Sequence, residues 1–287
     1  MQPLQILINQ LSRRRNIHIS VVDLNGILNT QNTSLDFQNV IHSRSFCWIA
    51  KSTQCGLDAC LRCKQQANQK AITGKTAFGG HCIYGLYEVA VPVIIEKSTA
   101  AIVYVGNAVI DENRTKKRIR KTCHRTGVSE QVLLSELQNC ELLESPDGLL
   151  QIGEIVSDYL KMLWETTSKK KPESHWLVNL MKRYAEEDFS QGICLREIAV
   201  THRMNEKYIG RIFKQKTGQS FHAYCMALRL QKAKQLLLQY DTKIIDIAME
   251  CGFDNVSYFN RMFRRQYHMS PTEYRKSSRE LPSFYDK

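Results

Sequence analysis

The hydrophobic pattern of the first 125 residues is typical of a mixed α/β domain with an antiparallel sheet. β-rich runs at 17–30 and 89–110 each enclose a turn signal, so that each run predicts a hairpin. Apolar residues at helical spacing predict two helices, over 4–15 and 57–73. We therefore expect two hairpins and two helices in this domain.

The C-terminal part of the chain repeats itself. Ile198-Ala199 recurs as Ile247-Ala248, and after one extra residue in the second copy further identities follow at an offset of 50 residues. These identities are Arg211 with Arg261, Phe213 with Phe263, Ser220 with Ser270 and Tyr224 with Tyr274. The repeat predicts two copies of one supersecondary unit.

Each copy contains a short helical pattern, a break and a longer pattern that begins at a capping Asn, which is typical of a helix-turn-helix unit. The capping residues are Asn205 and Asn255. Between the copies, residues 221–238 predict one connecting helix. At about 1.5 Å per residue it is about 27 Å long, which suits two longer helices roughly one duplex turn apart. We therefore expect an all-α domain with two helix-turn-helix units joined by a long helix.

The two longer helices each combine an apolar face with a polar, basic face. Ile209, Ile212 and Phe213 are predicted to point inward in one of them, and Phe259, Met262 and Phe263 in the other. The opposite faces suit base edges flanked by phosphates. The predicted base-reading residues are Lys207, Gly210, Arg211, Val256, Ser257, Asn260 and Arg261, and the predicted phosphate contacts are Lys182, Lys214, Arg264 and Arg265.

The segments "IFKQKTGQSFHAY", "RLQKAKQLL", "IIDIAMECGFDNVSYFNRMFRR" and "SPTEYR" resemble the DNA-binding domain of the AraC/XylS family of transcription regulators. The resemblance implies a seven-helix domain that binds double-stranded DNA through the two longer helices. It also implies an activator, with RNA polymerase as a partner. His268 stands where the family usually has glycine, as this chain does at Gly218, so we expect a strained or differently capped turn there.

The segments "SFCWIA", "GLDACLRC", "HCIYGLYEVAVPV" and "AAIVYVGNAV" resemble the PocR-type sensory domain, a PAS-like ligand-binding module. The resemblance implies a small-metabolite effector, as in regulators of diol or cobalamin-linked metabolism. Family members often read Cys-His-Ala-Gly-Leu where this chain has residues 82–86, with Ile83 and Tyr84 in place of His and Ala. That difference leaves the ligand open.

Five of the ten cysteines crowd into the middle of the sensory domain. Cys60 and Cys63 form a CxxC pair that, with neighbouring thiols or His81, could hold Zn²⁺ or an iron-sulfur cluster. Separate burial of the thiols and thiol redox sensing are the alternatives. The candidate ligand or metal residues are Cys47, Cys55, Cys60, Cys63, Cys82, His81, Tyr84 and Tyr104, the tyrosines as hydroxyl groups in a pocket.

The chain has 287 residues, more than the roughly 150 typical of one domain, and a formal net charge of +12. Residues 169–287 carry 22 basic and 13 acidic residues, against 18 and 15 in the rest, so the positive charge is concentrated in the predicted DNA-binding part. A Lys-Lys-Lys-Pro stretch is typical of a linker. The predicted boundaries are 1–125 for the sensory domain, 126–168 for a helical connector, 169–174 for the linker, 175–278 for the DNA-binding domain and 279–287 for a tail.

The predicted connector contains apolar residues at spacings of three and four, which are Leu149, Ile152, Val156, Tyr159 and Leu163. Such a two-heptad seam can pair with a second copy of the chain or pack on its own domain. In the first case the protein is a homodimer, and the ligand acts by changing the pairing of these helices. Both interpretations remain open at this stage.

No apolar run approaches the about 18 residues of a membrane-spanning helix, so we expect a cytoplasmic protein without a membrane partner. The sequence also contains no phosphate loop, HExxH motif or nucleophile elbow, so we do not expect an enzyme. The sequence therefore predicts a DNA-binding transcription regulator controlled by a small metabolite, or by metal or redox state. The alternatives are an Ada-like zinc-thiolate methyl acceptor joined to an AraC-type DNA reader, and an architectural DNA binder.

Overall fold

The structure is a computed structural model, and it describes residues 2–28, 32–41, 44–166, 176–188 and 194–279. The chain forms two compact units. The first comprises Met1–Leu177 with Arg196–Glu206, and the second comprises Val178–Leu195 with Lys207–Lys287. The predicted linker, 169–174, lies outside the described residues, as do residues 280–287 of the predicted tail.

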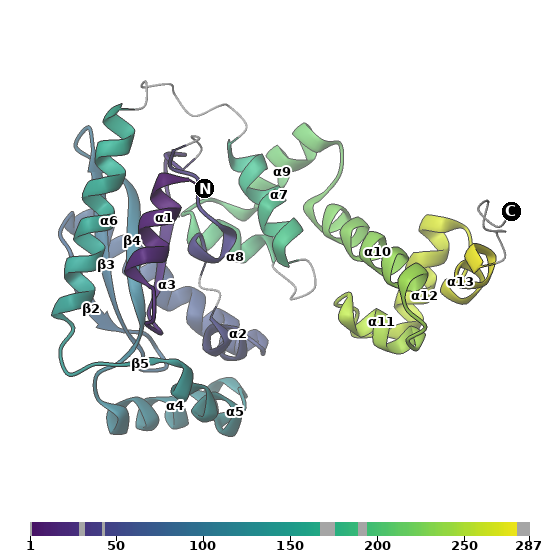
Figure 1. Cartoon of the computed structure of the whole chain (residues 1–287), viewed down its shortest axis with the longest axis horizontal. Helices are drawn as coiled ribbons and strands as arrows, with labels where there is room; N and C mark the ends of the chain where they lie inside the picture. The colour runs from purple at the N-terminus through teal and green to yellow at the C-terminus, as the bar shows by residue number, and fades with distance from the viewer. Residues whose placement is uncertain (1, 29–31, 42–43, 167–175, 189–193, 280–287) are drawn as a thin grey trace, which may run out of the picture. The chain divides into compact units, whose positions relative to one another are not determined.

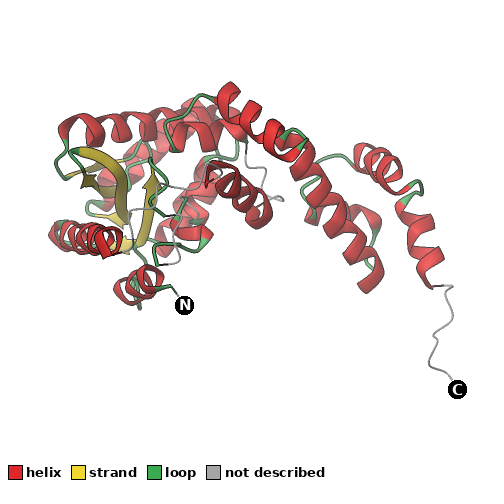
Figure 2. Ribbon diagram, turned by 90° about the horizontal axis from the view of Figure 1, so that it is seen from above, coloured by secondary structure: helices red, strands yellow, loops and turns green. Residues whose placement is uncertain are grey.

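A mainly antiparallel sheet forms the centre of the first unit, which confirms the predicted mixed α/β domain (Figures 1 and 2). The strand order within the described residues is β1-β4-β3-β2, with β5 paired in parallel to the end of β4. The strands are β1 (His18–Asp23), β2 (Phe78–His81), β3 (Tyr87–Ile95), β4 (Ser98–Val109) and β5 (Glu141–Leu142).

The predicted hairpin at 17–30 is wrong, because β1 pairs with β4 and not with the segment that follows it. The Asp23 carboxylate accepts hydrogen bonds from the backbone N–H groups of Asn25, Gly26, Ile27 and Leu28. These bonds curl the chain into a loop, so the second apolar run of the segment is buried without forming a strand.

The predicted hairpin at 89–110 is confirmed, because β3 and β4 pair antiparallel along most of their length. The chain turns at Glu96 and Lys97, whose φ angles are 47° and 64°. Two consecutive left-handed residues are the signature of a two-residue turn that matches the twist of the strands. Neighbouring residues on these strands point to opposite faces, so the hairpin contributes to the cores on both sides of the sheet.

One face of the sheet is covered by α6 (Asp147–Thr166), which also packs on α1 (Pro3–Leu11). Leu149, Ile152, Val156 and Leu163 are buried, and a Cβ on Gly153 would lie 2.7 Å from Val91 Cγ2. The apolar seam of the predicted connector therefore packs on its own sheet. Residues 126–166 are part of the first unit.

The opposite side of the sheet is covered by α3 (Gln54–Gly74), which contacts both central strands. Ala71 on α3 packs with Val22, Ala90 and Ile102 of the sheet. A second cluster of buried residues joins the neighbouring short helices and turns. These elements are α2 (Ser45–Ala50), α4 (Glu112–Thr126), α5 (Glu130–Ser135) and η2 (Glu136–Asn139). The short helix η1 (Phe37–Asn39) contacts β1 instead.

The second unit is all-helical, as the sequence predicts, and the long connecting helix α10 runs from Phe221 to Gln239. Its last turns pack with Ala248, Phe259 and Phe263 in one aromatic core. Among the described residues, no helix is long and apolar enough to cross a membrane. The other helices are α7 (Trp176–Asp188), α8 (Leu195–Thr201), α9 (Glu206–Thr217), α11 (Ile244–Glu250), α12 (Val256–Tyr267) and α13 (Pro271–Arg279), of which α8 continues from the second unit into the first.

Candidate ligand pocket and DNA-binding surface

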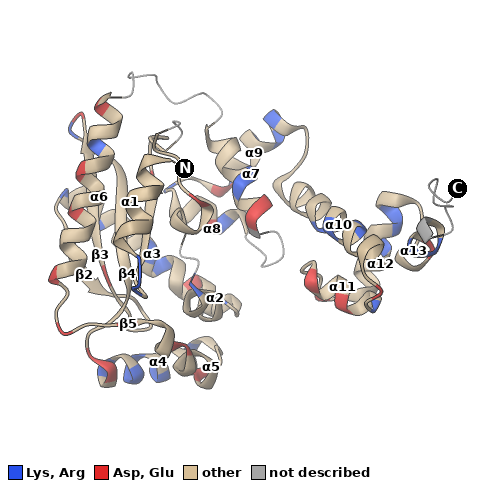
Figure 3. Ribbon diagram, in the orientation of Figure 1, with Lys and Arg blue, Asp and Glu red and all other residues tan. Residues whose placement is uncertain are grey.

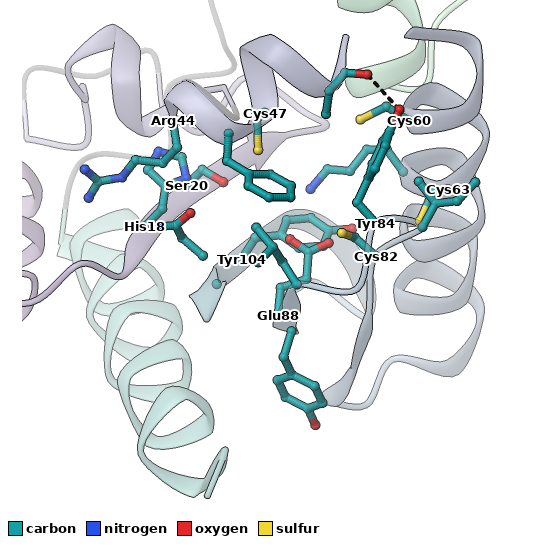
Figure 4. Close-up of a pocket in the computed structure, with 18 residues that line it drawn as sticks. His18, Ser20, Arg44, Cys47, Cys60, Cys63, Cys82, Tyr84, Glu88 and Tyr104 are labelled. Atoms are coloured by element: carbon teal, nitrogen blue, oxygen red, sulfur yellow. Dashed lines mark hydrogen bonds between the residues drawn. The ribbon is translucent and has the colours of Figure 1, made fainter. Parts of the chain in front are cut away.

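A cavity of about 60 Å³ lies in the first unit between the sheet and helices α2 and α3. In Figure 4, His18, Ser20 and Arg44 lie toward one end of this pocket and Cys60, Cys63 and Cys82 toward the other, with Glu88 and Tyr104 between them. The lining is mostly apolar, with a few polar groups that converge on one space. Such a composition is typical of a site for a small molecule.

Lys64 is one of two cationic residues that line the pocket, and it is half-buried. Its ammonium nitrogen lies 2.9 Å from the centroid of the Tyr104 ring, which is a cation–π contact. Burial lowers the pKa of Lys64 to about 8, while the carboxylate of Glu88 and the neighbouring thiols oppose that shift. The charged form of Lys64 is therefore held in the pocket at a cost in desolvation.

His18, at the other end of the pocket, is neutral at pH 7, because burial lowers its pKa to about 4. One ring nitrogen, Nε2, lies 2.7 Å from the backbone oxygen of Gln38. The ring is therefore a fixed wall of the pocket at neutral pH, and it carries no charge there.

Two polar atoms of the pocket are buried without a hydrogen-bond partner in the part of the chain that the structure describes: Ser20 Oγ and Arg44 Nε. Arg44 uses its terminal Nη2 to donate to the backbone oxygen of Ile17, at 2.6 Å, which anchors the guanidinium. A buried donor without an acceptor is costly and calls for a partner. The two orphan groups lie in the same end of the cavity (Figure 4).

The pocket thiols are protonated at neutral pH, because burial raises the pKa of Cys47 to about 12 and that of Cys60 to about 11. Burial also raises the pKa of Cys82 well above the usual range of a thiol. Metal ions and electrophiles react with the thiolate and not with the thiol. Within the described residues, no three His, Cys, Asp or Glu side chains are arranged to hold a metal ion.

The structure brings six of the eight sequence-predicted residues of this domain to one pocket: Cys47, Cys60, Cys63, Cys82, Tyr84 and Tyr104. The other two, Cys55 and His81, line a neighbouring groove, whose wall includes Cys63 and Cys82 of the pocket as well as Arg62, Arg118, Lys121 and Arg125. His81 stacks edge-on against Tyr87, with ring centroids 5.0 Å apart. The sequence analysis missed His18, Ser20, Arg44, Lys64 and Glu88, which lie on β1, before α2, on α3 and on β3 without a shared motif.

A hydrogen-bonded path leads from the pocket wall to helix α8 within the first unit. The Tyr104 hydroxyl donates to Asn68 Oδ1 at 2.6 Å, and Asn68 Nδ2 donates to the backbone oxygen of Thr201 at 3.0 Å. Asn68 is buried, and its amide oxygen and nitrogen are both used. A change at Tyr104 can therefore reach the C-terminal end of α8 through one side chain.

In the second unit, the polar faces of α9 and α12 are exposed, as predicted, and their apolar faces are buried. Figure 3 shows Lys and Arg on both helices and acidic residues on α11. Exposed members of the predicted sets are Lys207, Arg211, Lys214, Ser257, Asn260, Arg261, Arg264 and Arg265. Lys182 on α7 is half-buried.

Two predicted base-reading residues have a structural role that the sequence analysis missed. Val256 packs against the aromatic core of the second unit. A Cβ on Gly210 would lie 3.0 Å from Leu195 Cδ2, so glycine lets α9 approach the start of α8. Base reading by these two positions stays a prediction, and their packing contacts restrict the size of the side chain at each position.

A tyrosine three residues before the key arginine occurs in both longer helices. The Arg211 guanidinium lies over the Tyr208 ring at 5.9 Å, and the Arg261 guanidinium lies over the Tyr258 ring at 5.3 Å. The spacing of three places both side chains on one face of the helix. The offset of 50 residues that revealed the repeat also relates Tyr208 to Tyr258, so the signal was in the sequence.

The chain matches two family models. Residues 198–277 match a helix-turn-helix domain, and residues 1–167 match the sensory domain found in PocR. The second match spans more than half of the chain, and the first identifies a helix-turn-helix domain in its C-terminal part. The chain belongs to the AraC-type regulators that carry a PocR sensory domain.

Relatives among characterised and uncharacterised regulators agree with this class. The chain is 34% identical over 99 residues to the HTH-type transcriptional activator RhaS of Klebsiella pneumoniae, which is 34% of this chain and 36% of RhaS. It is 30% identical over 169 residues to the uncharacterised HTH-type transcriptional regulator YijO of Escherichia coli K12, which is 58% of each. The chain thus spans about a third to somewhat over half of the length of these relatives.

Solved structures similar to the chain include the C-terminal domain of AraT, a response regulator from Geobacillus stearothermophilus, at 30% identity and a TM-score of 0.35. That match covers 39% of this chain and 91% of AraT's domain. Another is the DNA-binding domain of AdpA in complex with a target DNA, at 25% identity and a TM-score of 0.34, covering 36% and 92%.

Proposed function

We propose that the chain is a transcription activator whose DNA binding is controlled by a small molecule in the pocket of the sensory domain. The observation that carries this proposal is the pocket itself, because it gathers desolvated charges and unpartnered donors inside a PocR-type domain. The similarity to the activator RhaS supports activation of transcription over repression, with RNA polymerase as a partner. Such a regulator acts in the cytoplasm, where bacterial DNA is.

In this proposal, the helices α9 and α12 enter the major groove of double-stranded DNA. Lys207, Arg211, Ser257, Asn260 and Arg261 read bases, because their side chains are exposed on the polar faces. Lys214, Arg264 and Arg265, with Lys182, contact phosphates and make the affinity salt-dependent. Gly210 and Val256 contribute to the same faces through their shape.

The two kinds of contact can be separated by mutation. Arg261→Ala should cost about 1–3 kcal/mol of specific binding and relax the preference at one base pair. Lys214→Ala should weaken binding to specific and random DNA alike and lower the salt slope by about one. Both are measured by fluorescence anisotropy with a selected operator and a scrambled duplex at several salt concentrations. Equal losses on both duplexes for both variants would refute the assignment of the reading residues.

Control by the pocket requires a route to the DNA-binding helices, and the proposed route is the path Tyr104–Asn68–Thr201. A ligand that moves the Tyr104 ring changes the hydrogen bond that Asn68 makes to the end of α8. Asn68→Leu should keep the pocket and abolish the effect of effector on DNA affinity, in a gel-shift assay with and without effector. Retention of the full effector response in that variant would exclude the route.

The methyl-acceptor alternative requires a nucleophilic thiolate. The pocket thiols are protonated at neutral pH because burial raises their pKa values, so they are poor nucleophiles. In the part of the chain that the structure describes, no three His, Cys, Asp or Glu side chains are arranged to hold a metal ion. We therefore propose neither Zn²⁺ nor an iron-sulfur cluster as a resident cofactor of the pocket. Elemental analysis of the anaerobically purified protein, beside a Cys60→Ser/Cys63→Ser variant, tests this choice, and stoichiometric metal lost in the variant would reverse it.

A further inference from the structure

The pocket of the sensory domain has an imbalance between donors and acceptors. Lys64 and Arg44 bring two cationic groups to it, while Glu88 brings one carboxylate. Ser20 Oγ and Arg44 Nε are buried without a partner in the described part of the chain. Protonated thiols and aromatic rings form most of the remaining wall. The end of the pocket that contains Arg44 therefore has donor capacity in excess of what the protein itself uses.

We infer that the pocket binds a small organic carboxylate, whose anionic group is held by Arg44, Ser20 and Lys64 and whose short carbon chain packs among the thiols and Tyr84. This inference rests on the proposed function of the pocket and names the class of its effector. A carboxylate is planar and accepts several hydrogen bonds, which matches a guanidinium nitrogen and a hydroxyl at one end of the site.

The electrostatics of the pocket favour an anion over a neutral polyol. The Lys64 ammonium group lies over the Tyr104 ring, where desolvation disfavours its charged form. An incoming negative charge offsets that cost, whereas a neutral hydroxyl group does so only in part. The orphan donor Arg44 Nε likewise gains more from a charged acceptor than from a neutral one.

The size of the cavity limits the ligand. A water molecule needs about 10–15 Å³ of such space, so about 60 Å³ has room for roughly four to six heavy atoms. Propionate and lactate fall in this range. Their neutral counterparts with the same carbon skeleton, propan-1-ol and propane-1,2-diol, provide matched controls that differ mainly in charge.

The test is isothermal titration calorimetry of the full-length protein with these four compounds. At least one carboxylate should bind at least tenfold more tightly than its neutral counterpart. Lys64→Met, which keeps an unbranched side chain one atom shorter and removes the charge, should weaken carboxylate binding at least tenfold, and Ser20→Ala should weaken it several-fold. Cys55→Ser, at a residue that lines the neighbouring groove and not the pocket, is the control and should bind like the wild type. The thermal unfolding midpoint of each variant verifies that it folds.

Three results would overturn the inference: a neutral compound that binds as tightly as its carboxylate, unchanged carboxylate binding by Lys64→Met, or binding of neither carboxylate. The proposed function is tested separately, by gel shift with and without the compound that binds. A diol that binds and changes DNA affinity would refute the carboxylate and keep the ligand-controlled regulator. A carboxylate that binds without any effect on DNA affinity would support the carboxylate site and refute the ligand-controlled regulator.

Discussion

The two helix-turn-helix units reach the same backbone geometry with different residues. In the first, the turn after α8 is closed by a hydrogen bond from Met204 N to Ala199 O, and in the second the equivalent bond joins Phe253 N to Ala248 O. Each unit also needs a left-handed residue in this turn and another after its longer helix. The duplicated geometry is therefore fixed by hydrogen bonds rather than by identical side chains.

Each unit fills only one of its two left-handed positions with glycine. The first has Arg203 in the turn, with φ of 54°, and Gly218 after α9, with φ of 79°. The second has Gly252 in the turn, with φ of 79°, and His268 after α12, with φ of 60°. The departure noted at His268 thus gives the same left-handed cap as glycine, at some conformational cost.

The outer faces of the two short helices differ more than their inner faces. On α8, Glu197 forms an ion pair with Lys51, and Arg196 forms one with Asp58. Both partners belong to the sensory domain. The equivalent residues of α11 are Asp246 and Ile245, which are both exposed. The two helix-turn-helix copies therefore share the turn hydrogen bonds and the buried inner face of the short helix. They differ in the outer face of that helix, which in the first copy forms ion pairs with the sensory domain.

The largest expected effect comes from the buried ion pair of α8. The Lys51 and Glu197 side chains are 6% and 15% exposed and 2.5 Å apart. Glu197→Gln should cost about 3–5 kcal/mol of unfolding free energy, because it leaves the Lys51 charge buried without its carboxylate. Urea denaturation followed by tryptophan fluorescence measures this loss.

The second helix-turn-helix unit supplies the control for this prediction. Asp246→Asn, at the equivalent exposed position of α11, should change the unfolding free energy by less than about 0.5 kcal/mol. A double variant Lys51→Met/Glu197→Leu should recover most of the loss, since an apolar pair replaces the charges. Equal small effects for Glu197→Gln and Asp246→Asn would show that the outer faces are energetically alike.

The next largest effect is a difference in pH dependence between the two turns. His202 is buried in the first turn, with ring Nδ1 2.7 Å from the backbone oxygen of Asp23, and burial lowers its pKa to about 4. The folded protein favours the neutral form of the His202 ring. The resulting stability is therefore fully present above pH 6.5 and is lost as the pH falls toward 4. The loss should be about 3 kcal/mol. The equivalent Cys251 stays neutral in that range, because burial raises its pKa to about 11.

The measurement is urea denaturation at pH 7 and pH 4.5 for the wild type and for His202→Gln. The variant should lose less stability on acidification than the wild type. The Asp23 carboxyl, whose pKa burial raises to about 6, titrates in the same range with the opposite sign, and it cancels in the comparison. Parallel pH profiles of the two proteins would contradict the prediction.

A smaller effect concerns the two caps after the longer helices. A Cβ on Gly218 would meet nothing within 4 Å, so Gly218→Ala should cost only the left-handed conformation, about 1 kcal/mol. His268→Gly removes the same penalty and should stabilise the second unit by about 0.5 kcal/mol, since the gain is reduced by the extra freedom of glycine in the unfolded chain. Thermal unfolding of both variants checks the opposite signs, and equal signs would contradict the account.

The sequence predicted the helical domain in detail because its signals are local. Caps such as Asn255, which accepts from Tyr258 N, and the repeat of apolar positions lie within single helices. The predicted hairpin at 17–30 failed because the Asp23 carboxylate redirects the chain, and β1 pairs with a strand about 80 residues away. The pocket was predicted only through its cysteines and tyrosines. Lys64 and Arg44 joined it through tertiary packing, which a single sequence does not encode as a motif.

The smallest expected effect concerns the tyrosine that lies beside each reading arginine. Tyr208→Leu should weaken specific DNA binding by about 0.5–1 kcal/mol, because it removes a cation–π contact that holds the Arg211 guanidinium, while Tyr208→Phe keeps the ring and should bind like the wild type. Tyr258→Leu should behave in the same way through Arg261, but Tyr258 also packs on the aromatic core, so its variant should lose unfolding stability as well. Fluorescence anisotropy on the operator combined with thermal unfolding separates the two losses. Tyr208→Leu could instead bind DNA like the wild type while Tyr258→Leu does not. In that case the tyrosine would not position Arg211, and the two reading helices would differ in how they hold their arginine.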